Sequence, residues 1–151
     1  MANSPSFVDH ALDLLSLVGP VQARPMFGGH GVYLRGVMFG LLDDDELFLK
    51  TDLVSRPRFK DADCRMWVYP DADETSYWRP PDEAHEDAES MLPWARLGLE
   101  AALRIRAAKD GDARARAARR GEREARAAIR KTAPARKKPT RGGPAARKGR
   151  R

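Results

Sequence analysis

The most constraining feature of this 151-residue sequence is that its large apolar residues stop well before its end. Every Phe, Tyr and Trp lies at or before Trp94, and Ile129 is the one large aliphatic residue after position 106. A segment with so few large apolar side chains cannot bury enough surface to offset the entropy lost on folding. We therefore expect one folded domain over residues 1–106, followed by a tail over residues 107–151 that is partly helical or disordered.

Charge divides at the same boundary. Residues 1–106 hold 18 acidic and 11 basic residues, whereas residues 107–151 hold 4 acidic and 17 basic residues. The net charge of +6 is therefore the sum of an acidic domain and a strongly basic tail.

Clustered Lys and Arg without aromatic residues suit contacts with nucleic-acid phosphates, which are non-specific and depend on salt. They do not suit base stacking, which needs aromatic platforms. A tail that only solubilises the protein, or that contacts the acidic domain, is the alternative. The cations that we expect to contact nucleic acid are Arg114, Arg116, Arg119, Arg120, Arg123, Arg126, Arg130, Lys131, Arg136, Lys137, Lys138, Arg141, Arg147, Lys148, Arg150 and Arg151.

Several other classes of protein are disfavoured. No apolar run approaches the roughly 20 residues that cross a bilayer, and the N-terminus lacks the basic and apolar stretches of a secretory signal. The single cysteine, Cys64, excludes an intrachain disulfide and fits a reducing compartment. We expect a cytoplasmic protein without a membrane partner, associated with the nucleoid if the tail binds DNA. The sequence leaves the oligomeric state open.

The spacing of apolar residues predicts an α+β fold. Helical spacing over 5–18 and 90–107 predicts a helix at each end of the domain, capped by Ser4 or Ser6 and by Ser90. The run 37–42 is almost continuously apolar, which indicates a central strand. We expect an antiparallel sheet of about five to six strands flanked by these helices. The predicted strands are 21–26, 31–35, 37–42, 47–51, 64–69 and 76–79.

The glycine-rich stretch around Gly28 and Gly29 is interpreted as a turn. Its spacing is not that of a dinucleotide or P-loop motif, and a strand follows it where a phosphate loop would need a helix. Glycine at such a position supplies a positive φ, and Met26 and Phe27 are then expected to anchor the core beside the turn.

No residues predict catalysis, a cofactor or a metal. The histidines, His10, His30 and His85, do not form a metal-ligand pattern with Cys64. The acidic run 43–46 lacks the spacing of a calcium loop, and indicates a solvated hairpin turn. Lys50 is a cation in an otherwise apolar strand. It can contact a ligand or nucleic acid, or face outward at a sheet edge; we favour the second.

Consecutive passages of the domain resemble the TfoX N-terminal domain family. They are residues 24–33 (RPMFGGHGVY), 36–41 (GVMFGL), 47–52 (LFLKTD), 76–83 (SYWRPPDE) and the closing helix around 92–102. The resemblance implies a small α+β domain and a link to TfoX/Sxy regulators of competence genes, which are thought to work with other transcription factors. The longer regulators carry a second, helical domain in place of this tail. The motif residues Met26, Phe27, Gly28, Gly29 and Lys50 are interpreted as structural.

Three functional hypotheses follow. The first is a non-enzymatic regulator that attaches to nucleic acid through its tail and has a transcription factor or other protein as partner. The second is a protein-binding adaptor without nucleic acid, using the acidic surface or an exposed Trp67 or Trp78. The third is a small ligand-binding or enzymatic domain, which requires candidate side chains to converge in a pocket. These candidates are Arg24, His30, Tyr33 and Lys50.

Overall fold

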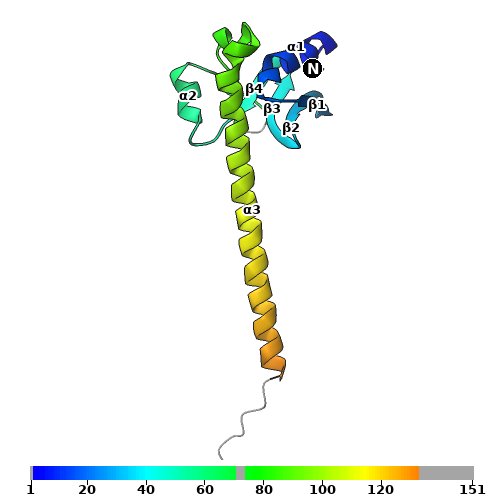
Figure 1. The fold of residues 1–151 in the computed structure, drawn as a ribbon, viewed down its shortest axis with the longest axis vertical. Helices are drawn as coiled ribbons and strands as arrows, with labels where there is room; N and C mark the ends of the chain where they lie inside the picture. The colour runs from blue at the N-terminus through cyan, green and yellow to red at the C-terminus, as the bar shows by residue number, and fades with distance from the viewer. Residues whose placement is uncertain (1, 71–73, 133–151) are drawn as a thin grey trace, which may run out of the picture. The chain divides into compact units, whose positions relative to one another are not determined.

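The computed structural model describes residues 2–70 and 74–132, which form an α+β fold (Figure 1). Residues Met1–Asp112 form one compact unit, and Ala113–Arg151 form a second unit that is described separately. The helix α3 contributes to both units. In chain order the elements are α1 (Pro5–Leu15), η1 (Ser16–Val18), β1 (Val21–Met26), β2 (Gly29–Leu34), β3 (Val37–Asp43), β4 (Glu46–Lys50), α2 (Arg56–Asp61), β5 (Tyr77–Trp78), η2 (Asp82–His85) and α3 (Ala88–Thr132).

The sheet is an antiparallel meander in the order β1-β2-β3-β4-β5, as the sequence predicts. Its first three connections are two-residue turns in which both central residues have positive φ. Such turns match the twist of the strands that they join. The central pairs are Phe27-Gly28, Arg35-Gly36 and Asp44-Asp45, so the acidic run is a hairpin turn as predicted.

One face of the sheet packs against the helices. Side chains of α1, α2, α3 and strands β2 to β5 form a single buried cluster, in which Phe39 and Phe59 are the largest fully buried members. Helix α3 packs closely on the sheet at Gly98, where a Cβ would lie 3.2 Å from the Cβ of Leu49. Residues Phe39–Leu42 are buried, which confirms the prediction that β3 is central.

The segment 64–69 is not the strand that alternation predicts. It makes one isolated bridge, between Met66 and Trp78, and β5 is limited to two residues. The sheet therefore has five strands, and the side chains of 67–69 are free to lie over one of its faces.

Helix α3 differs from its prediction at both ends. Its N-terminus is capped by Asp87, whose carboxylate accepts the Ser90 N–H at 2.7 Å, so Ser90 is not the cap. The helix continues through Gly111 and Gly121 to Thr132. The region from residue 133, where the sequence predicts irregular structure, lies outside the described residues. None of the helices described here combines the length and apolar character that crossing a membrane requires.

Candidate functional site

The glycine-rich stretch around Gly28 and Gly29 forms the turn of the β1–β2 hairpin, in which the Phe27 side chain is exposed to solvent. Phe27 and Gly28 have φ values of 48° and 80°. Glycine adopts this region freely, whereas a bulky L residue rarely does. The Phe27 side chain is 94% exposed, so the prediction that it anchors the core is wrong. Met26 is partly buried next to it.

Gly29 and Gly31 are required by close packing. A Cβ on Gly29 would lie 2.4 Å from the Leu42 carbonyl oxygen, and one on Gly31 would lie 2.9 Å from a ring carbon of Tyr33. The two glycines are two residues apart on β2 and therefore share a face. They leave a stretch of that face without side chains, on the side of the sheet away from the helices.

A β-bulge brings Met38 and Leu41 to the same face. The register between β2 and β3 shifts so that Phe39 has no partner on β2. Phe39 points into the core, while Met38 and Leu41 both line the opposite face. Side chains of a regular strand alternate, so residues three apart share a face only through such an irregularity.

Three aromatic side chains, those of Trp67, Tyr69 and Tyr77, lie across from the hairpin and are called the aromatic wall. The Trp67 N–H donates to the Tyr77 carbonyl at 2.8 Å, and the Thr75 hydroxyl donates to the Trp67 carbonyl at 2.5 Å. The indole N–H of Trp67 donates to Asp43 at 3.0 Å. The Trp67 ring centroid lies 5.3 Å from that of Tyr69 and 6.2 Å from that of Tyr77. The hydrogen bonds fix Trp67 beside Tyr77, and the Tyr69 ring packs against the Trp67 ring.

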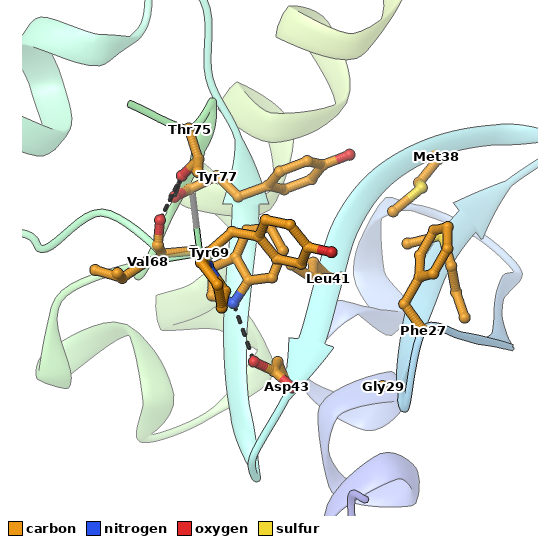
Figure 2. A pocket seen from close by; sticks show the side chains of 12 residues that line it. Phe27, Gly29, Met38, Leu41, Asp43, Val68, Tyr69, Thr75 and Tyr77 are labelled. Carbon is orange, nitrogen blue, oxygen red and sulfur yellow. Dashed lines mark hydrogen bonds between the residues drawn. The ribbon is translucent and has the colours of Figure 1, made fainter. Parts of the chain in front are cut away.

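Between the hairpin and the aromatic wall lies an open pocket of about 470 Å³. Figure 2 shows Tyr69 and Tyr77 on one side, Met38 and Phe27 on the other, and helices behind the strands. The pocket volume falls within the roughly 300–1,000 Å³ of small-molecule sites, which are mostly apolar with few polar groups. Here the polar side chains include Asp43 and Thr75, both of which hydrogen-bond to the wall.

A second hollow, of about 300 Å³, adjoins the first, because Met38 and Tyr77 line both. Lys50, Arg106 and Lys109 also line it. The Lys50 ammonium lies 4.7 Å from the Tyr77 ring centroid, a cation–π distance. Burial, and then the charge of Lys109, lower the pKa of Lys50. Across residues 2–70 and 74–132, no ion pair involves any of these three cations.

The helical segment Ala113–Thr132 carries a separate basic surface. Its side chains are all exposed. At 3.6 residues per turn, seven cations fall within an arc of roughly 140°. We call this arc the basic face: it consists of Arg116, Arg119, Arg120, Arg123, Arg126, Arg130 and Lys131. Arg114 projects from the opposite side of the helix. Figure 1 shows this segment in yellow to orange.

Acidic residues interrupt the basic face little. The described part of the helix has one intrahelical ion pair, between Arg120 and Glu124 at 3.0 Å. Three other pairs of an acidic and a basic residue at i,i+4 spacing, 110/114, 112/116 and 122/126, are not within ion-pair distance. Most of the basic face therefore keeps its charge available to a partner.

Comparison with known proteins identifies the domain that carries the pocket. A model of the TfoX N-terminal domain family matches residues 13–102, from within α1 to within α3. This chain belongs to the TfoX N-terminal domain family. No curated protein matches the chain significantly. The match ends before the basic face, so the basic face lies outside the recognised TfoX N-terminal domain.

The motif residues of the TfoX N-terminal domain gather at the pocket. Met26, Phe27 and Gly29 line the first hollow, and Lys50 lines the second. Gly28 lies between Phe27 and Gly29 in the turn, and no atom lies within 4 Å of where its Cβ would be. Lys50 is on β4, which is an inner strand, so it does not face outward at a sheet edge as expected.

Two of the other ligand candidates of the TfoX N-terminal domain share this face. The Arg24 guanidinium lies 4.8 Å from the Tyr33 ring centroid, and Tyr33 pairs with Met38. The His30 side chain lies on the opposite face of β2, where its Nδ1 is 2.9 Å from the amide nitrogen of Asn3. Sequence reasoning missed Trp67, Tyr69 and Tyr77 as lining residues, because nothing local predicts which face they cover.

Nothing in the described residues of the TfoX N-terminal domain assembles a catalytic centre around Cys64. Burial raises the pKa of the Cys64 thiol, which favours the unreactive protonated form. His85 lies 2.9 Å from the Pro81 carbonyl oxygen and makes no hydrogen bond to the thiol. Within residues 2–70 and 74–132, no group of three or more His, Cys, Asp or Glu side chains is placed to hold a metal ion.

The remaining predicted contacts of the tail with nucleic acid lie outside the described residues. They are Arg136, Lys137, Lys138, Arg141, Arg147, Lys148, Arg150 and Arg151.

Proposed function

We propose that this protein is a non-enzymatic regulator of the TfoX type that attaches to nucleic acid through the basic face of α3. Membership of the TfoX N-terminal domain family supports the regulatory part. The observation that carries the attachment is the gathering of seven exposed cations on one side of a helix. The proposed role places the protein in the cytoplasm, close to the nucleoid.

Phosphate contacts explain the chemistry of this attachment. Each Lys or Arg that neutralises a phosphate releases condensed counterions, so the logarithm of the affinity falls linearly with the logarithm of salt concentration. The side chains of the basic face are all Arg or Lys, and they include no aromatic ring that could stack on a base. Contacts to phosphates position a protein without reading sequence. The binding is therefore expected to be non-specific and steeply dependent on salt.

The proposal is tested by titrating the full chain with a labelled DNA duplex, followed by fluorescence anisotropy, between roughly 50 and 200 mM salt. Arg123→Gln is compared with Arg114→Gln, which removes the same charge from the opposite side of the same helix. Arg123→Gln should weaken binding severalfold and reduce the salt slope by about 1. Arg114→Gln should change both quantities much less.

A triple variant, Arg116→Gln with Arg123→Gln and Arg130→Gln, should lower the slope by about 3. Failure of the full chain to bind duplex at low salt would refute the attachment. Equal losses in Arg123→Gln and Arg114→Gln would show that general charge, rather than the basic face, binds the duplex.

A protein partner, such as a transcription factor, is the second part of the proposal. The loop between β4 and α2 exposes two neighbouring apolar side chains, Leu53 and Val54, which suit contact with a protein. Affinity purification with and without nuclease separates the two kinds of association. A partner retained after nuclease treatment is bound by protein contacts, whereas one that is lost was bridged by nucleic acid.

A further inference from the structure

We propose that the open face of the sheet binds a small organic anion, with an apolar ring or chain in the aromatic pocket and the anionic group beside Lys50. The residues involved all belong to the compact unit Met1–Asp112, and none of them is a member of the basic face. The proposal therefore stands apart from nucleic-acid attachment and adds a ligand to the TfoX N-terminal domain.

The cationic end of this site is unusual for a structural cluster. Lys50, Arg106 and Lys109 surround one hollow, and no acidic residue is among those that line it. Like charges held together without a counter-charge repel each other, and burial adds a desolvation cost for Lys50. An anionic group in the hollow would offset both effects. Pairing with a carboxylate of the chain would do the same, but the described residues supply none.

The opposite end of the site carries negative charge. Asp43 and Glu46 are register partners at the β3–β4 hairpin, and Glu46 lies four residues before Lys50 on β4. Four steps along a strand span roughly 13 Å. Asp43 lines the pocket and is held by the Trp67 indole, whereas the charge of Glu46 is offset by its ion pair with Arg65. A bound anion is therefore attracted at the Lys50 end and repelled at the Asp43 end, which gives the ligand one orientation.

The apolar part of the site suits a flat ring or a short chain. Trp67, Tyr69 and Tyr77 supply aromatic surface on one side, and the thioethers of Met26 and Met38 supply adaptable surface on the other. A tyrosine hydroxyl is protonated at neutral pH and can donate a hydrogen bond, and burial, followed by the nearby Tyr33, raises the pKa of Tyr77 further. A donor of this kind can bond to an anionic oxygen.

Phe27 gives an independent reason to expect a ligand. A large apolar side chain is 94% exposed in a backbone conformation that bulky residues rarely adopt. Arg35 has nearly the same φ in the next hairpin, so the turn type accounts for the backbone, and what sets Phe27 apart is an apolar ring left exposed beside the pocket. Phe27 lines the pocket across from Tyr69 and Tyr77, where its ring can contact a ligand (Figure 2).

The test uses two fluorescent probes of similar shape on the full chain. Anilinonaphthalene sulfonate is an anion, and phenylnaphthylamine is its neutral counterpart. Both should bind saturably at one site. Lys50→Met should weaken sulfonate binding about tenfold, as the loss of one charge-assisted contact implies, and change amine binding less than about twofold. Lys50→Arg should keep most of the sulfonate affinity.

Phe27→Asn should weaken both probes, because it removes apolar contact and leaves the charges intact. Arg114→Met is the matched control for loss of a cation outside the site, and it should change neither probe. Near-ultraviolet circular dichroism checks that each variant is folded. Equal weakening of both probes by Lys50→Met, or no weakening of either, would overturn the proposal, as would binding that does not saturate. The triple variant of the basic face should bind the probes normally, so failure here is distinguishable from failure of nucleic-acid attachment.

Discussion

At the scale of single residues, Phe27 combines an unfavourable backbone conformation with a place in the lining of the pocket. The two-residue turns of this sheet have positive φ at both central positions, where Asn-Gly is the preferred pair. We predict that Phe27→Asn increases the free energy of unfolding by about 1 kcal/mol, because Asn tolerates this conformation better. Urea denaturation followed by tryptophan fluorescence measures the change.

Arg35→Asn is the control for Phe27→Asn, because Arg35 occupies the equivalent position of the next hairpin with φ of 50°. Both variants should be stabilised, but Phe27→Asn alone should lose affinity for the probes. Destabilisation by Phe27→Asn would mean that the exposed ring contributes packing energy, contrary to the prediction.

Lys50 illustrates what can be learned about a residue before the fold is known. Its charge within an apolar run marks it as a candidate, because few strands tolerate a buried cation without a reason. Its strand neighbours do not reveal that β4 is an inner strand, nor that α3 brings Arg106 and Lys109 to its side. Those facts depend on how distant segments pack.

At the scale of elements, Asp52 connects the end of β4 to helix α3. The Arg104 guanidinium donates to both carboxylate oxygens of Asp52, at 2.6 and 3.0 Å, and the Ser55 N–H donates to one of them at 2.9 Å. Its bonds to Arg104 are the main reason that the pKa of Asp52 lies well below its usual range.

We predict that Asp52→Asn lowers the free energy of unfolding by about 1–2 kcal/mol at neutral pH. A carboxylate with a depressed pKa in the folded state stabilises the fold above its unfolded pKa of about 3.9, and this contribution is lost as the pH falls through the folded value. The difference between the two proteins should therefore shrink in acid. A double-mutant cycle with Arg104→Gln isolates the pair, and a cycle energy near zero would contradict the assignment.

The elements differ in how well local patterns predict them. Helix α1, the first part of α3 and the first four strands follow from apolar spacing and from turns rich in Gly and Asp, because each depends on near neighbours. The segment 64–69 alternates like a strand, yet its place depends on Trp67 reaching Asp43 and on the short β5. A strand needs a partner along its whole length, which spacing alone does not supply.

At the scale of the whole molecule, the two units are stabilised by different interactions. The compact unit buries a core, whereas the side chains of Ala113–Thr132 are exposed, so this helical segment depends on local propensity. Gly121 has nothing within 4 Å of where its Cβ would lie. Gly121→Ala should stabilise the helix by about 1 kcal/mol and increase the far-ultraviolet helical signal.

All three tryptophans lie in the compact unit, so their fluorescence reports on that unit alone. The midpoint of unfolding measured by tryptophan fluorescence should therefore be the same in Gly121→Ala and the native chain. Ala118→Gly, the reverse change nearby, should reduce the helical signal without moving this midpoint. A shift of the tryptophan midpoint in either variant would show that the two units unfold together.

The sequence by itself determined the features that depend on composition and on near neighbours. The end of the apolar residues separates a domain from a basic tail, periodicity predicts α+β structure, and the series of motif passages from 24 to 102 identifies the family. Tertiary structure alone decided where the pocket lies. The bulge at Phe39, the aromatic wall at Trp67 and the cations around Lys50 meet through contacts between distant segments. Such contacts depend on which faces pack together, and no local pattern encodes that choice.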